Sequence, residues 1–241
     1  MRPGERVDDL QRGSLRIIQN ERLFRFGTDA VLLSDFALIK PRARVMDLGT
    51  GTGVIALLVA ARYPDARIEA VELQPYFAEL AQKNIELNAL NDRIFVHEMD
   101  MRLAAQKLGY GRMDQVICNP PYFEQGSSLL PESENKLLSR MDASIGIDEI
   151  ARIAFALLKS GGRYSVVFPA QRLCDLLFAM QNARLAPKRI RSVHATLQHA
   201  PKLVLVDAVK QGGSQMHWLP PLILKNPDGT NTPEWERIYG E

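Results

Sequence analysis

The stretch VMDLGTGTGVIAL, residues 45–57, joins two apolar segments through a loop with glycine at every second position. Residues 44–48 read as a buried strand, and residues 54–63 have apolar side chains at helical spacing. Glycines let the main chain turn sharply and let a ligand approach it closely. In an open parallel sheet, ligands bind beyond the carboxyl ends of the strands, where this loop would lie. The stretch therefore predicts a strand, a ligand-binding loop and a helix in succession.

The same alternation of strand and helix continues along the chain. Strands are predicted at 67–73, 93–100, 114–119, 163–168, 188–197 and 202–210, and helices at 75–87, 147–158 and 171–183. Residues 218–230 hold a further strand and a Pro-Asp-Gly turn. This alternation predicts an α/β fold, with a mostly parallel sheet covered by helices on both faces.

The chain before the glycine loop is expected to form small additions to the core. Residues 14–26 alternate and break at Asn20-Glu21, which predicts a hairpin. Residues 28–37 predict a short helix capped by Thr28 or Asp29. We expect residues 1–40 to pack on a core domain of residues 41–241, with residues 212–241 as a C-terminal extension. The polar stretch 123–146 is either a substrate lid or an ordinary insertion.

The bulk properties of the chain exclude several classes of protein. It has 241 residues, 46% of them hydrophobic, and a net charge of +2, so a nucleic-acid partner would need local basic patches. Two cysteines suit a reducing compartment. The charged first residues lack the apolar core of a signal peptide, and no apolar run approaches the ~20 residues of a membrane helix. His194, His199 and His217 have no metal-ligand spacing. We expect a cytoplasmic protein without a membrane segment or a metal site.

A carboxylate at the end of the second strand favours a nucleoside ligand. Glu72 follows the glycine loop by about 20 residues, where a carboxylate can accept hydrogen bonds from ribose hydroxyls. The dinucleotide pattern G-x-G-x-x-G would need glycine where the chain has Val54. A nicotinamide enzyme is therefore disfavoured.

The fourth strand ends in Asn119-Pro120-Pro121-Tyr122, at the same edge of the predicted sheet. The side-chain carbonyl of Asn119 and the backbone carbonyl of Pro120 are two acceptors that can hold one exocyclic amino group. Tyr122 can stack on the planar group that carries it, and Phe123 can extend this aromatic wall. Two fixed acceptors orient the amine and favour the positive charge that develops on its nitrogen during methylation. The alternative is a simple strand terminator.

These motifs resemble the class I S-adenosylmethionine-dependent amino-methyltransferases, with their D-x-G-x-G-x-G loop and [DNS]-P-P-[YFW] signature. The resemblance implies a Rossmann-like fold with a mostly parallel seven-stranded sheet. It places Asp47 and the loop residues at the amino-acid end of the cofactor, Glu72 at the ribose and Asp100 near the adenine. The cofactor residues implied are Thr28, Asp29, Asp47, Gly49, Thr50, Gly51, Gly53, Glu72, Asp100 and Asn119, and the catalytic residues are Asn119, Pro120, Pro121 and Tyr122.

Over nearly its whole length, the chain resembles the bacterial family that N6-methylates the adenine beside the anticodon of a valine tRNA. The segment RFGTDAVLLSDFA, residues 25–37, resembles that family's first cofactor motif, so Thr28 and Asp29 would contact the methionine part of the cofactor. After the lid, SRMDASIG departs from the family pattern, so no lid contact is carried over. Methylation of a protein glutamine, of DNA adenine or of guanine N2 stays open as an alternative, as does an RNA-binding protein without catalysis.

A basic segment, residues 184–210, gives separate support for an RNA partner. It contains six Lys or Arg residues and one acid, and such an excess can neutralise phosphates. The alternative is a solvated face of the protein. The candidate RNA-binding residues are Lys188, Arg189, Arg191 and Lys202, with Phe123 near the lid.

Overall fold

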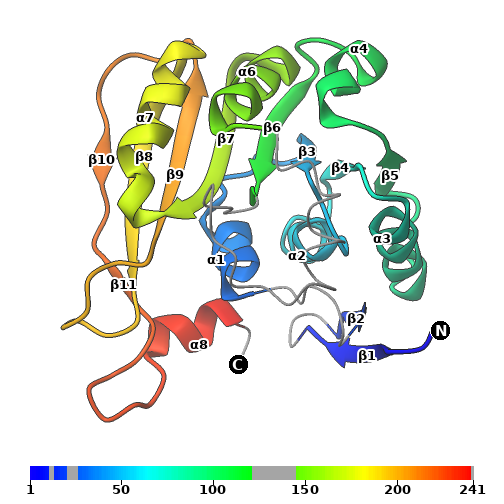
Figure 1. Ribbon diagram of the computed structural model, residues 1–241, viewed down its shortest axis with the longest axis horizontal. Helices are drawn as coiled ribbons and strands as arrows, with labels where there is room; N and C mark the ends of the chain where they lie inside the picture. The colour runs from blue at the N-terminus through cyan, green and yellow to red at the C-terminus, as the bar shows by residue number, and fades with distance from the viewer. Residues whose placement is uncertain (11–13, 21–26, 121–144, 240–241) are drawn as a thin grey trace.

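The computed structural model describes residues 1–10, 14–20, 27–120 and 145–239 (Figure 1). Within these ranges, no helix is both long enough and apolar enough to cross a membrane. Pro121, Tyr122 and Phe123 of the predicted site lie outside the described residues, as does nearly all of the predicted lid.

Seven strands form the body of the main sheet. They are β3 (Arg44–Leu48), β4 (Arg67–Glu72), β5 (Ile94–Glu98), β6 (Met113–Cys118), β7 (Leu158–Pro169), β8 (Leu185–His194) and β9 (Leu203–Lys210). Their spatial order is β8-β9-β7-β6-β3-β4-β5, and β9 alone is antiparallel to its neighbours. The predicted, mostly parallel sheet is confirmed, and two short strands extend these seven to nine in the described residues. The short strands β10 (His217–Trp218) and β11 (Leu222–Ile223) both pair with β8.

Helices cover both faces of this sheet. The helices are α1 (Thr28–Phe36), α2 (Val54–Arg62), α3 (Pro75–Leu87), α4 (Ala104–Leu108), α6 (Ile147–Leu157), α7 (Leu173–Asn182) and α8 (Pro233–Tyr239). In Figure 1, α7, α6 and α4 lie along the upper side of the sheet, and α1, α2 and α3 along the lower side. Neighbouring strand residues such as Val45 and Met46 belong to different hydrophobic cores, because successive side chains of a strand point to opposite faces. The strands are therefore apolar on both faces.

The N-terminal hairpin includes a strand, β1, that was not predicted. Strand β2 (Arg16–Asn20) pairs antiparallel with β1 (Glu5–Asp9), upstream of it, and residues 21–26 lie outside the described residues. The other edge of β2 is occupied by side chains, since the main chain of Ile18 is hydrogen-bonded to Asn84 of α3 and that of Arg16 to Asn88, the C-cap of this helix. The predicted small N-terminal hairpin is therefore present as β1 and β2, while the second arm expected at residues 21–26 lies outside the described residues.

Two further predictions concern the ends of elements. Helix α1 begins at Thr28 with Gly27 as its N-cap, so the expected cap by Thr28 or Asp29 is wrong by one or two residues. Asp29 instead accepts a hydrogen bond from Asn119 at the edge of the sheet. The turn predicted at Pro227-Asp228-Gly229 is confirmed, and Gly229 has the left-handed φ of 87°.

Candidate active site at the carboxyl edge of the sheet

The candidate site lies where β3, β4, β5 and β6 end side by side. The register pairs Leu48 with both Val71 and Cys118, so the residues that follow these strands meet at one edge. The amides of Gly49 and Thr50 donate to the carbonyl of Val71 at 2.9 and 3.0 Å. The glycine loop is therefore tied to the end of the neighbouring strand.

The loop needs glycine for its conformation and for access. Gly49, Gly51 and Gly53 have φ of 71°, 56° and 82°, a region that side chains with Cβ rarely adopt. A Cβ on Gly51 would meet nothing within 4 Å, whereas a Cβ on Gly53 would lie 3.3 Å from that of Ala81 in α3. Gly53 thus permits close helix packing, and Gly51 leaves the main chain open to a ligand.

Asp47 is a buried carboxylate with unused hydrogen-bonding capacity. It is 1% exposed, and its Oδ2 accepts a hydrogen bond from Thr50 Oγ1 at 2.6 Å. No group of the described residues hydrogen-bonds to Oδ1. The pKa of Asp47 is raised to about 7, mainly by burial and also by the charge of Glu72, while the contacts with Thr50 and the Ala56 amide offset part of the rise. A cationic ligand group at this place would favour the ionised form.

Glu72 holds the glycine loop from the end of β4. Its Oε2 accepts from the Gly51 amide and its Oε1 from the Gln74 amide, both at 2.9 Å. Burial raises the pKa of this carboxyl group, and the backbone hydrogen bonds oppose the rise. Each oxygen keeps a second lone pair for a ligand hydroxyl.

Asn119 follows β6 directly and is oriented by a residue far away in sequence. Its Nδ2 donates to Asp29 Oδ2 at 3.0 Å, and Asp29 Oδ1 accepts from the Ala30 amide at 3.0 Å. A carboxylate at neutral pH only accepts hydrogen bonds, so the amide nitrogen must face Asp29 and the carbonyl oxygen must face away. The next residue, Pro120, is buried. The contact brings two predicted site residues together and fixes which atom of Asn119 is presented.

The other predicted cofactor residues lie nearby with distinct surroundings. Asp100 caps a short 3-10 helix by accepting from the Arg102 amide at 2.8 Å and also pairs with the Arg102 guanidinium at 3.0 Å. Thr50 is buried, and Thr28 is exposed at the start of α1.

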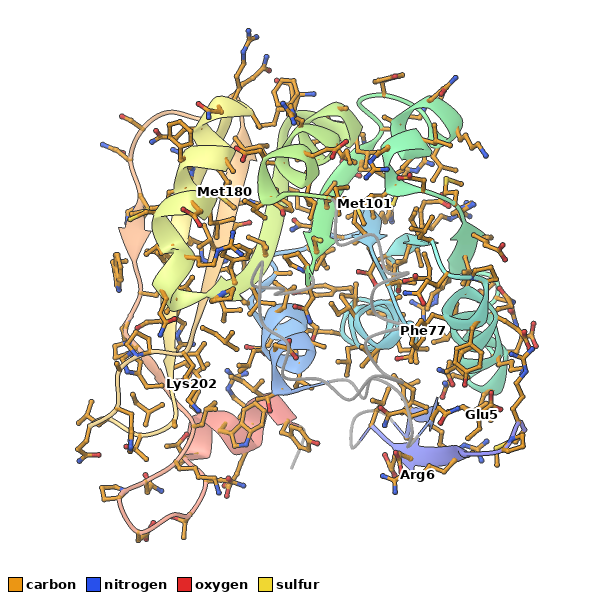
Figure 2. The ribbon with its side chains drawn as sticks, viewed as in Figure 1. Glu5, Arg6, Phe77, Met101, Met180 and Lys202 are labelled. Carbon is orange, nitrogen blue, oxygen red and sulfur yellow. The ribbon has the colours of Figure 1, made fainter. Side chains whose placement is uncertain are left out.

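The sequence did not single out three further residues at this edge. Met101, labelled in Figure 2, has its Cε 3.6 Å from the position of a Cβ on Gly49. Leu73 remains 39% exposed directly after Glu72, and Asn84 contacts the loop at Thr52. An apolar residue beside a strand-end acid is a usable signal for Leu73 and Met101. Asn84 has no comparable signal in the sequence.

The candidate RNA-binding cations are mostly engaged within the fold. Arg189 donates to the Phe36 carbonyl at 3.2 Å and stacks over the Phe36 ring at 4.4 Å. Arg191 holds both oxygens of Glu234 at 2.9 and 2.8 Å, and Lys188 donates to the carbonyls of Gly213 and Gln215. Lys202 is exposed at the start of β9 and is labelled in Figure 2. These contacts anchor α1 and the C-terminal extension to β8.

The described residues offer no cluster of metal ligands. There, His, Cys, Asp and Glu side chains form no group of three or more that could hold a metal ion. Cys118 is buried at the end of β6, where burial raises the pKa of its thiol, and Cys174 is exposed.

Comparison with known proteins gives consistent similarities. A profile of the methyltransferase small domain matches residues 25–179. The tRNA1(Val) (adenine(37)-N6)-methyltransferase of Porphyromonas gingivalis strain ATCC 33277 is 30% identical over 222 residues, which cover 89% of this chain and 86% of that protein. The protein of the same name from Yersinia pestis strain Pestoides F is 28% identical over 224 residues, covering 90% and 86%.

Solved structures are similar in fold. A predicted O-methyltransferase, Atu636 from Agrobacterium tumefaciens, has a TM-score of 0.72 at 24% identity, covering 88% of this chain and 95% of its own. TYW2 of P. horikoshii, solved in complex with MeSAdo, has a TM-score of 0.60 at 18% identity, covering 88% and 73%.

Proposed function

Since this chain belongs to the methyltransferase small domain family, and within it to the tRNA1(Val) (adenine(37)-N6)-methyltransferases, we propose that it N6-methylates an adenine in tRNA. The chain is an S-adenosylmethionine-dependent methyltransferase. The observation that carries the choice of an amino group as acceptor is the oriented Asn119 amide at the end of β6. A tRNA substrate would place the reaction in the cytoplasm.

The glycine loop fits the cofactor. Left-handed Gly51 leaves its main chain open, and the unpaired Oδ1 of Asp47 and the second lone pairs of Glu72 are acceptors for a ligand with cationic and hydroxyl groups. In this proposal Asp47 faces the amino-acid end, Glu72 accepts from the ribose, and Leu73 and Met101 are apolar neighbours for the adenine ring. Asp100 would meet the adenine amino group, and Thr28 the methionine part. S-adenosylmethionine supplies a methyl group activated by its sulfonium charge.

Asn119 and Pro120 act on the methyl acceptor. The Asn119 carbonyl oxygen and the Pro120 carbonyl each accept one N–H of the target amino group, which directs the nitrogen lone pair toward the methyl group. Both acceptors also stabilise the positive charge that develops on the nitrogen. No strong base is required, because the methylated ammonium group loses its extra proton readily. Tyr122 would stack on the adenine after it is turned out of the RNA.

Asp29 strengthens this arrangement. It keeps the Asn119 carbonyl oxygen, rather than the NH2 group, facing the reaction. A hydrogen bond to a carboxylate also polarises the amide, which makes that oxygen a better acceptor. We therefore assign Asp29 a positioning role beside its proposed contact with the cofactor.

The test is incubation of the protein with labelled S-adenosylmethionine and, in parallel, total tRNA, total rRNA, DNA or a release factor. Nucleoside analysis should find N6-methyladenosine in a tRNA and no label in the other samples. The Asn119→Ala protein is the control, because it should leave the tRNA unlabelled. Label in the release factor, or in a guanine, would contradict the proposed substrate.

A further inference from the structure

Asn84 of α3 joins the N-terminal sheet to the glycine loop. Its side chain is fully buried, its Oδ1 accepts from the Ile18 amide at 2.6 Å, and its Nδ2 donates to the carbonyls of Ile18 at 3.1 Å and Thr52 at 2.9 Å. Both hydrogens of the amide are thereby used. One side chain thus holds the main chain of β2 and the main chain of the loop.

Asn88 repeats the contact with β2 one helical turn later. The Arg16 amide donates to its Oδ1 at 2.9 Å, and its Nδ2 donates to the Arg16 carbonyl at 2.6 Å. Four residues of helix rise about 6 Å, and two residues of strand about 6.6–6.8 Å, so the two amides match alternate residues of β2. Helix α3 therefore takes the place of a third strand beside β1 and β2, which lie below it in Figure 2. Asn88 differs in that its remaining hydrogen bond goes to the Asn84 carbonyl, at 2.7 Å, and not to the loop.

The contact with Thr52 falls at the most constrained part of the loop. Thr52 lies between Gly51 and Gly53, which both have left-handed conformations. Gly53 packs on Ala81, one turn before Asn84 on the same helix. The Ile18 amide must donate to the Asn84 oxygen, and this turns the Asn84 nitrogen toward Thr52. Docking of β2 thus determines the orientation of the group that holds the loop.

We propose that Asn84 is a positioning residue that couples docking of the N-terminal sheet to cofactor binding at the glycine loop. Each event stabilises the other, because a coupling between two sites is reciprocal. The proposal rests on the proposed function only through the binding of S-adenosylmethionine at that loop.

Asn84→Ala and Asn88→Ala form a matched pair of variants. Each loses two hydrogen bonds to β2, but only Asn84→Ala loses the bond to Thr52. Calorimetry with S-adenosylhomocysteine should give roughly tenfold weaker binding for Asn84→Ala, and a change within about twofold for Asn88→Ala. Equal affinities for the wild type and Asn84→Ala would overturn the proposal.

Hydrogen exchange in the wild-type protein tests the coupling without any variant. Saturating S-adenosylhomocysteine should slow exchange of the Ile18 amide and its neighbours in β2. In Asn88→Ala, β2 should exchange faster than in the wild type, but S-adenosylhomocysteine should still slow this exchange. In Asn84→Ala, S-adenosylhomocysteine should no longer slow it. Cofactor binding with unchanged exchange in β2 would overturn the coupling alone. A wild-type protein that binds no cofactor would overturn the cofactor site together with the coupling.

Discussion

Two regions were predicted to be functional: the ends of strands β3, β4 and β6, and the cationic residues of β8. Their side chains differ in how they are hydrogen-bonded within the fold. At the strand ends, Asp47 has an oxygen without a hydrogen bond in the described residues, and Asn119 is fixed so that one particular atom is presented. On β8, Lys188, Arg189 and Arg191 use their donors on carbonyls and a carboxylate of the same chain. Residue type alone therefore predicted both regions. They differ in that Asp47 keeps an oxygen without a hydrogen bond in the described residues, whereas the three cations of β8 are bonded within the fold.

The strand-end region should dominate catalysis, and Asn119→Ala should have the largest effect. Loss of an acceptor that acts on the transition state should lower kcat by ~10²-fold or more. Cofactor affinity should stay near that of the wild type, because Asn119 acts on the substrate amine. Methyl transfer to tRNA and calorimetry measure the two quantities. A parallel loss of affinity would place Asn119 in the cofactor site instead.

Asp29→Ala should have a smaller effect through the same amide. Without the carboxylate, the Asn119 side chain can turn its NH2 group toward the substrate, so kcat should fall roughly tenfold. The Asp29→Ala/Asn119→Ala double variant should be no slower than Asn119→Ala, because both changes remove one interaction. Fully additive losses in single-turnover assays would contradict the positioning role.

Asp47 should make cofactor binding depend on pH near neutrality. The pKa of about 7 lies above the ordinary value of 3.8, so the folded protein holds this proton more tightly than the unfolded chain. In the cofactor-free protein, the contribution of Asp47 to the free energy of unfolding therefore falls as the pH rises from 3.8 toward 7. The cationic cofactor favours the ionised form, so its affinity should rise roughly tenfold between about pH 6 and about pH 8, with release of a proton.

Calorimetry in buffers of different ionisation enthalpy would detect that proton. Asp47→Asn should abolish the pH dependence and keep the weaker affinity throughout. The control is Glu72→Gln, which should weaken binding but retain the step near neutral pH. A step that disappears in Glu72→Gln and persists in Asp47→Asn would assign the proton to Glu72.

The cations should give the smallest effects, and of different kinds. Arg191→Ala removes a bidentate pair that holds α8, so it should lower Tm by roughly 2–4 °C while leaving the salt dependence of tRNA binding unchanged. Lys202→Ala should leave Tm unchanged and reduce the slope of log affinity against log salt by about 1. A reduced salt slope with unchanged Tm in Arg191→Ala would instead support β8 as an RNA-binding surface.

Local sequence patterns predicted the parts of the site that lie on single elements. The glycine loop, the acid after β4 and the amide after β6 each follow a strand that is apolar on both faces, and such strands are readable one at a time. The contacts between elements were not readable. Asp29 and Asn119 are 90 residues apart in sequence, and although each was predicted as a site residue, nothing in the sequence indicated that they contact each other.

The partner of β2 in the N-terminal hairpin was not readable for the same physical reason. Alternation in residues 14–26 is compatible with several partners, and the choice is made by which edge of β2 stays open. Asn84 and Asn88 close one edge, and in a sequence they look like two polar residues on the surface of an amphipathic helix. Side chains that hydrogen-bond to a strand edge in place of a neighbouring strand give no periodic pattern in the sequence.

The antiparallel strand β9 has a consequence for synthesis on the ribosome. Strand β8 is made before β9, but within the described part of the chain it joins β7 and the strands beyond only through β9, which pairs with β7 on its other side. Nascent chains that end before Leu203 therefore expose the edges of both β7 and β8 to other chains. Insertion of the eight residues of β9 pairs the free edges of β7 and β8 in one step. The seven central strands are therefore fully paired only after nearly all of the protein has been made.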